Sequence, residues 1–117
     1  KVVVCDRFTD STLAYQGYAR GLDLEMIERL NQIACAGIVP DRTILIVRDT
    51  AEALICARRE GADRLEAESL AFHQKVAAGF AALAAADGGA RIVTIALAED
   101  RDETEAAIFR ALEDLLR

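Results

Sequence analysis

Several side chains that can bind a phosphorylated ligand lie close together near the start of the chain, beginning with Asp6 and Arg7. The planar guanidinium of an arginine matches a phosphate group in bidentate fashion, and a neighbouring carboxylate can orient it or a magnesium-bound water. An Asp-Arg pair alone is more often a structural ion pair. Here the next residues add hydroxyl, aromatic and amide groups suited to a planar base and a sugar, namely Ser11, Thr12, Tyr15 and Gln16. The spacing therefore favours a nucleotide site.

A continuous apolar, β-branched run at residues 2–4 directly precedes this polar segment. Such a run is typical of a strand covered on both faces in a parallel sheet. Ligands of open parallel sheets bind outside the carboxyl ends of the strands, which is where a strand at residues 2–4 would place Asp6 and Arg7. We expect Ser11 to cap a short helix that follows this strand, and the glycines around Arg20 to form a turn.

Strand and helix patterns alternate through the rest of the chain. A fully buried strand is predicted at residues 43–47, and a further strand, rich in isoleucine and valine, at residues 91–97. One helix is predicted to start at Asp23 and to stop at Gly37, and a second to begin after a cap at Asp49 or Thr50. A long helix is predicted over residues 66–86, and a final one after a cap at Asp102. This alternation predicts an α/β fold, a parallel sheet with flanking helices, in a single domain over residues 1–117.

Composition restricts the class of protein further. The chain has 117 residues, 53% of them apolar, and a formal charge of −6. Acidic proteins are poor binders of duplex nucleic acid, although a small phosphorylated ligand needs only a local group of arginines. No apolar run approaches the roughly 18 residues of a membrane span, and the three cysteines show no metal-ligand spacing. We therefore expect buried, reduced thiols, no membrane and no nucleic-acid partner, and a cytoplasmic location.

The segment from Val4 to Gln16 resembles the signature segment of the thymidylate kinase family position by position. The resemblance continues through Gly17, Arg20, Gly21, Asp23, Pro40, Asp41 and Thr43, and through Arg58, Gly61, Asp63 and Arg64. It implies the fold of P-loop NTPases and nucleoside monophosphate kinases. It also implies transfer of the γ-phosphoryl group of ATP to thymidine monophosphate (dTMP) with Mg2+, in dTTP biosynthesis, by a homodimer whose contacts include the helix from Asp23 to Ala36.

Roles for the acceptor site, residues 1–23, follow from the resemblance alone. Arg7 is expected to grip the dTMP phosphate, with Asp6 organising the magnesium region and Phe8 among the substrate-binding residues. Thr12 and Gln16 are expected near the thymine edge, and Tyr15 beside the deoxyribose, where it disfavours a 2′-hydroxyl. No residue is assigned as a direct metal ligand.

The segment from about 58 to 64 resembles the family's lid, a loop that closes over the ATP phosphates. Its arginines, Arg58, Arg59 and Arg64, are expected to bind ATP, and Arg58 and Arg64 join Asp6 and Arg7 as candidate catalytic residues. The alternative interpretation is that these arginines are basic side chains at a solvated helix end. For Arg59 this alternative is as well supported as a role in the lid.

The pattern G-x-x-x-x-G-K-[ST] of a P-loop occurs nowhere in the chain, although the family carries it on its first strand. That strand lies between the two represented here by residues 2–4 and 43–47, so we expect an incomplete sheet and a partial kinase domain that is inactive alone. The chain is then the C-terminal portion of a longer kinase, or is completed by another chain. Val47, Cys56 and Ala96 depart from the family pattern and leave a second hypothesis open, a catalytically inactive nucleotide-binding module. A kinase for another nucleoside monophosphate is a third.

Overall fold

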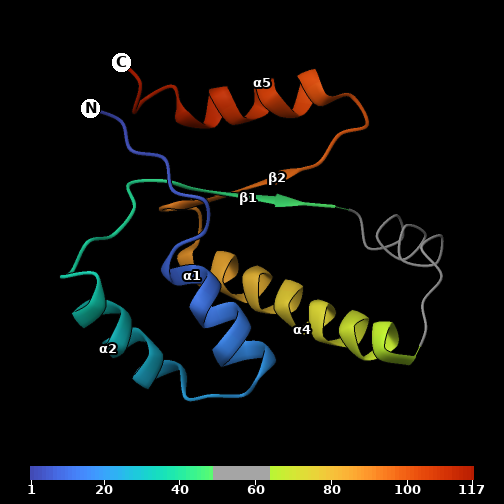
Figure 1. The fold of residues 1–117 in the computed structure, drawn as a ribbon. Coiled ribbons are helices and arrows are strands. Elements are labelled where there is room, and N and C mark those ends of the chain that lie inside the picture. Colours follow the sequence, from blue (N-terminus) through green and yellow to red (C-terminus); the bar gives the residue numbers. More distant parts are fainter. Residues whose placement is uncertain (49–63) are drawn as a thin grey trace.

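A computed structural model describes residues 1–48 and 64–117 and shows a small parallel sheet between helices. Figure 1 shows one helix, α5 (Arg101–Leu112), on one side of the strands, and the remaining helices on the other side. These are α1 (Thr9–Thr12), the π-helix η1 (Leu13–Ala19), α2 (Leu24–Ala34) and α4 (Arg64–Asp87). The predicted α/β class is confirmed. The helix predicted after Asp49 or Thr50 lies outside the described residues.

Two parallel strands, β1 (Thr43–Val47) and β2 (Ile92–Ala96), form the sheet of the described residues. Their register pairs Thr43 with Ile92 and Val47 with Ala96. The strands predicted at residues 43–47 and 91–97 are thus confirmed, the second within one residue at each end. The prediction of full burial is wrong for β1, because Ile46 and Val47 are 48% and 37% exposed at the strand's carboxyl end.

Residues 2–4 do not form the predicted strand. They are irregular, and Val3 and Val4 are 88% and 91% exposed. The physical reason is a missing partner: among the described residues no strand runs beside them, and an extended segment gains little unless a neighbouring strand accepts and donates its backbone hydrogen bonds. The β-branched run records a preference for burial that these residues do not satisfy.

Cys5 is exposed and Cys35 is half-buried, so the expectation of buried thiols is wrong for both.

The helix ends are set by local hydrogen bonds. Asp23 caps α2, as predicted, by accepting a hydrogen bond from the Met26 amide at 2.7 Å, and Gly37, with φ of 75°, follows its end. The cap of α5 is Asp100, which accepts from the Asp102 amide, rather than Asp102 itself. Ser11 lies inside α1 and caps nothing; the N-cap position is Phe8, which has no side-chain cap.

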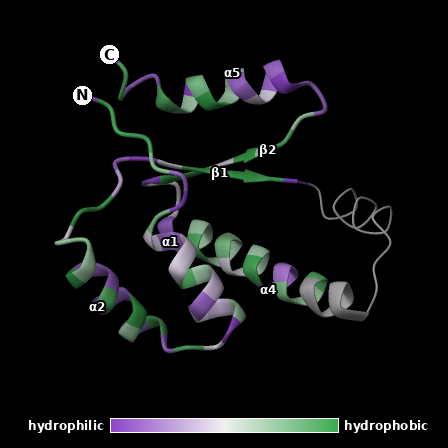
Figure 2. Cartoon of the chain, in the orientation of Figure 1, coloured by the Kyte–Doolittle hydropathy of each residue, from purple (hydrophilic) through white to green (hydrophobic). Residues whose placement is uncertain are grey.

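The core lies where η1, α4 and β2 meet. Its buried apolar side chains come from these elements and α2, and Figure 2 shows the green, hydrophobic strands between the helices. The most buried are Leu13, Ala14, Ile27, Val76, Ile92 and Ile95. Gly79 lets α4 approach η1 closely, because a Cβ there would lie 2.7 Å from the Tyr18 Cβ. This packing fixes the segment that carries the candidate site.

Candidate functional site

Arg7 and Tyr15 lie together, as the shared-site prediction requires. The Arg7 Cζ atom is 5.3 Å from the centre of the Tyr15 ring, within the range of a cation–π contact. Arg7 has a φ of 61°, in the left-handed region that residues with a Cβ seldom occupy, at a cost of about 1–2 kcal/mol. The guanidinium is exposed, so its donors remain within reach of an anion from solvent.

Aromatic rings from α4 hold Tyr15 in place. Its ring meets Phe72 edge-on at 6.0 Å between centroids and Phe80 at 6.4 Å. Both geometries are in the favourable range for aromatic pairs. Arg20 lies on the same cluster, with its Cζ 4.9 Å from the centre of the Phe72 ring. Two guanidinium groups therefore flank a line of packed rings, an arrangement that presents positive charge beside an aromatic surface.

The other predicted acceptor residues lie on the same short segment. Phe8, Thr12 and Gln16 are half-buried, and the Gln16 carbonyl accepts a hydrogen bond from the Leu22 amide at 3.0 Å. Asp6 is exposed just before this segment. The side-chain roles assigned to these residues stay predictions.

A partly buried ion pair that the sequence did not reveal ties this segment to the sheet. Asp10 in α1 is only 8% exposed, and each of its carboxylate oxygens accepts a hydrogen bond of 2.8 Å from a different nitrogen of Arg91. The Thr43 hydroxyl accepts from the same guanidinium and donates to Asp10 at 3.4 Å. This bidentate contact raises the pKa of Arg91 and joins residues 81 positions apart. In the sequence, the only indication of this ion pair was that Asp10 lies in the segment that resembles the family.

Asp87 fixes the turn that leads into β2. Its Oδ2 accepts hydrogen bonds of 2.8 Å from the amides of Arg91 and Ile92. These bonds hold the pKa of the Asp87 carboxyl below its ordinary value, with the charge of Arg91 adding to the effect. Bonds to the ionised form explain the direction, because protonation would weaken them.

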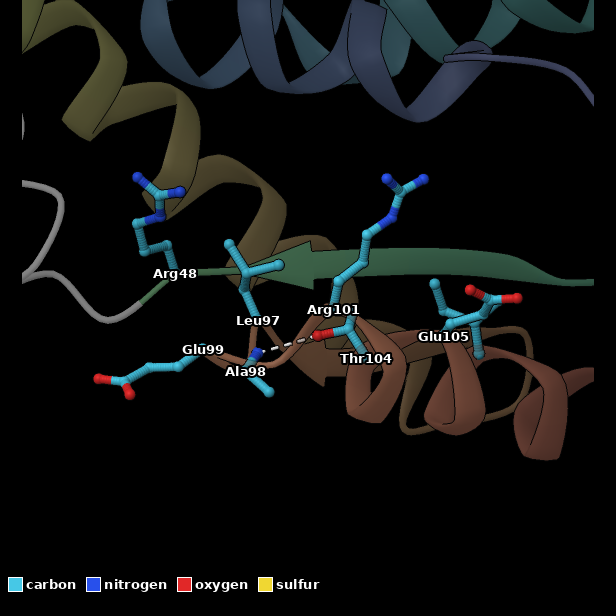
Figure 3. A pocket seen from close by; sticks show the side chains of 8 residues that line it. Arg48, Leu97, Ala98, Glu99, Arg101, Thr104 and Glu105 are labelled. Carbon is cyan, nitrogen blue, oxygen red and sulfur yellow. Dashed lines mark hydrogen bonds between the residues drawn. The ribbon is translucent and has the colours of Figure 1, made fainter.

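A pocket of about 600 Å3 opens at the carboxyl ends of both strands. Arg48 follows β1, Leu97 and Ala98 follow β2, and Arg101 and Thr104 belong to α5. In Figure 3 the side chains of Arg48 and Arg101 point the same way on either side of Leu97. The Thr104 hydroxyl accepts a hydrogen bond from the Ala98 amide at 3.0 Å and so fixes the loop between β2 and α5.

The lid prediction lies largely outside the described residues. This holds for Arg58, Arg59 and Cys56, while Arg64 is described only as the first residue of α4. Within residues 1–48 and 64–117, no three His, Cys, Asp or Glu side chains lie close enough to hold a metal ion. In the same part of the chain, no helix is long and apolar enough to cross a membrane.

Comparison with known proteins identifies the family. The family model described as thymidylate kinase matches residues 1–108. Thymidylate kinase of Solidesulfovibrio magneticus is 47% identical over 124 residues, covering 99% of this chain and 59% of that protein. Thymidylate kinase of Gloeobacter violaceus is 56% identical over 85 residues, covering 70% of this chain and 40% of that protein.

A solved structure agrees with the sequence matches. The crystal structure of thymidylate kinase from Ehrlichia chaffeensis superimposes with a TM-score of 0.73 at 29% identity, covering 97% of this chain and 51% of that one. The chain thus spans little more than half the length of the relatives that it matches along its whole length. With the packing of Arg7 against Tyr15 and the parallel strands between helices, these matches show that the chain belongs to the thymidylate kinase family and has a P-loop NTPase fold.

Proposed function

We propose that the protein carrying this chain transfers the γ-phosphoryl group of ATP to dTMP, forming dTDP for dTTP synthesis. In this proposal the chain supplies the acceptor site and the lid, while the P-loop comes from sequence outside it. The observation that carries the proposal is the exposed Arg7 guanidinium held at the Tyr15 ring, in a segment that matches the family. A cation beside a ring suits an acceptor that joins a phosphate to a nucleoside, because the cation can bind the phosphate while the ring packs against the nucleoside.

Arg7 acts on the phosphate of dTMP. Its guanidinium leaves the ring face on binding, or keeps one edge there, and donates paired hydrogen bonds to phosphate oxygens. A charge-assisted bond of this kind contributes about 1.5–3 kcal/mol. Phosphoryl transfer depends mainly on positioning and charge neutralisation, so a fixed acceptor phosphate is itself a large part of catalysis.

Tyr15 and its neighbours recognise the nucleoside. Tyr15 lies beside the deoxyribose and leaves no room for a 2′-hydroxyl, since Phe72 and Phe80 prevent its ring from retreating. Thr12 and Gln16 contact the thymine edge, and Phe8 completes the substrate-binding residues. These roles are what the resemblance to the family implies, and the match of the family model to residues 1–108 supports them.

Magnesium fits the donor set at Asp6. Mg2+ usually takes one or two protein carboxylates and completes its shell with water and nucleotide phosphates, so it does not require a cluster of three protein ligands. Asp6 is an exposed carboxylate next to Arg7 and would organise the ion's surroundings. When bound, the ion supplies neutralisation of charge on the transferring phosphoryl group.

The donor nucleotide lies at the carboxyl ends of the strands in this proposal. Ligands of open parallel sheets bind at that edge, where the pocket beside Arg48 and Arg101 lies. Arg58, Arg59 and Arg64 close over the ATP phosphates from the lid and exclude water during transfer.

A homodimer and a cytoplasmic location complete the proposal. One side of α2 exposes large apolar side chains to solvent, with Met26, Leu30 and Ile33 at 47%, 57% and 78% exposure. Burial of this apolar surface against a second copy would be favourable. A cytoplasmic location suits an enzyme that produces nucleotides, and the free thiols of Cys5 and Cys35 agree with a reducing compartment.

A nucleotide-binding module without catalysis is the second candidate. It is favoured by two apolar residues at the strand ends, Val47 and Ala96, where the family commonly has aspartate. Loss of these carboxylates would remove charge from the edge where ATP and magnesium meet.

One assay separates the candidates. The full protein, purified with ATP and Mg2+, is given dTMP, dUMP, dCMP, dAMP or dGMP, and nucleoside diphosphate is measured by chromatography. The proposed function predicts dTDP as the main product. Binding of dTMP without any diphosphate would replace it by the second candidate, and a preference for another monophosphate would replace dTMP as the substrate.

A further inference from the structure

The acceptor segment has little stability of its own. Its first helix, α1, has four residues, and Phe8 at the N-cap offers no side-chain hydrogen bond. It passes directly into η1, and the joined stretch from Thr9 to Ala19 is still shorter than the roughly 12–15 residues at which an isolated helix becomes even marginally stable in water. The segment therefore depends on contacts with the rest of the fold for its position.

The partly buried group of Asp10, Arg91 and Thr43, here called the Asp10 lock, supplies such a contact at the first turn. It joins α1 to Thr43, the first residue of β1, and to Arg91, which directly precedes β2. Both strands meet at this end in register, so the lock fixes α1 to the most regular part of the fold. Asp87, which binds the Arg91 amide, in turn fixes the backbone of the arginine.

The candidate substrate-binding side chains lie on both sides of the lock along the chain. Arg7 lies just before the N-terminus of α1, and Thr12 belongs to the same α1 helix as Asp10. Tyr15 and Gln16 follow in η1, which continues α1 without a break. A rotation of α1 would therefore displace the phosphate-binding and the nucleoside-binding groups together.

We propose that the Asp10 lock is a positioning device for the acceptor site, setting the distance and angle at which Arg7 and Tyr15 meet a monophosphate. This inference rests on the proposed function. Asp10 is a positioning residue and does not touch the substrate, because both of its carboxylate oxygens are bound by Arg91.

A second ion pair provides a matched control. Arg42 binds Asp114 at 2.6 Å and also joins distant parts of the chain, but Asp114 is well exposed and neither residue belongs to the acceptor segment. Arg42→Lys and Arg91→Lys are the same chemical change, each keeping a positive charge and losing the planar fork. Only the second acts on the lock.

The first experiment is steady-state kinetics of the full protein with Arg91→Lys, Asp10→Asn, the double variant, and Arg42→Lys. The lock predicts a KM for dTMP raised about 10- to 100-fold by either lock variant, with the KM for ATP changed much less. The double variant should resemble the worse single variant, since both remove one interaction. Arg42→Lys should leave the ratio of the two KM values as in the parent protein. Equal changes in both KM values, or a normal KM for dTMP, would overturn the proposal.

The second experiment does not depend on the substrate. Hydrogen exchange is followed by mass spectrometry in peptides covering residues 9–19, at a temperature where each variant remains folded. Asp10→Asn should speed exchange in these peptides relative to those covering α5, whereas Arg42→Lys should not. An unchanged exchange rate in residues 9–19 of Asp10→Asn would contradict the positioning role of the Asp10 lock, even if the KM for dTMP changed. If the parent protein neither binds nor phosphorylates dTMP, the proposed function fails, and the exchange measurement still decides whether the lock fixes the segment.

Discussion

Gly79 offers the sharpest test of how α4 is packed against the acceptor segment. A Cβ added there would lie 2.7 Å from the Tyr18 Cβ, 3.1 Å from the Tyr18 Cγ and 3.3 Å from the Ala14 Cα. A change of rotamer can move the Tyr18 Cγ, but the Tyr18 Cβ and the Ala14 Cα are fixed by the backbone, so the closest contact cannot be relieved in this way. We therefore expect Gly79→Ala to force α4 and η1 apart.

Two opposing effects set the magnitude. Alanine is favoured over glycine in a helix interior by about 0.8–1.0 kcal/mol. Overpacking of a filled core costs about 1–3 kcal/mol, and the upper half of that range applies here because the nearest contact must lengthen from 2.7 Å to at least 3.4 Å. The net expectation is a loss of about 1–2 kcal/mol in the free energy of unfolding.

The assay is urea unfolding of the full protein, followed by circular dichroism, for the parent and Gly79→Ala. Ala81→Gly is the control, because residue 81 is exposed on the same helix and reports the helix preference without a packing change. The control should lose about 1 kcal/mol. If Gly79→Ala were as stable as the parent or more stable, the close approach of α4 to η1 would be wrong.

Two further predictions concern local interactions. Asp87→Asn should lower stability at pH 7, because the ionised Asp87 carboxyl accepts hydrogen bonds from two backbone amides. Folding lowers the pKa of this carboxyl. The stability that Asp87 contributes is therefore present above the ordinary aspartate pKa of about 3.9, and it is lost as the pH falls through the lower pKa of the folded protein. Urea unfolding at pH 7 and near pH 2.5 should show the gap between parent and variant shrinking in acid; a gap independent of pH would contradict it. Asp23→Ala should cost about 1 kcal/mol by removing the cap on the Met26 amide, and Asp23→Ser should restore most of that loss; equal stability of the alanine and serine variants would refute the capping role.

Local patterns predicted the elements whose partners lie within the chain. Apolar, β-branched runs identified β1 and β2 almost to the residue, and Asp23 and Gly37 marked the ends of α2. The same reasoning failed at residues 2–4, since an apolar run records a tendency to be buried and cannot show that a neighbouring strand is present.

The site was only partly accessible from the sequence for a similar reason. The family-like segment pointed to Arg7 and Tyr15, which the structure brings together. The pairing of Asp10 with Arg91 joins residues too far apart for any local pattern to reveal. The π-helix at η1 and the close approach at Gly79 also arise from packing between elements, which propensity does not encode.

Titration of dTMP into the full protein without ATP, followed by calorimetry, tests the central claim most directly. The claim is that the segment around Arg7 binds the acceptor monophosphate. Arg7→Ala should weaken binding about 10- to 100-fold, as the loss of a charge-assisted phosphate contact implies, whereas Arg110→Ala, an exposed arginine on α5, should bind like the parent. Equal affinity of the parent and Arg7→Ala would contradict the account.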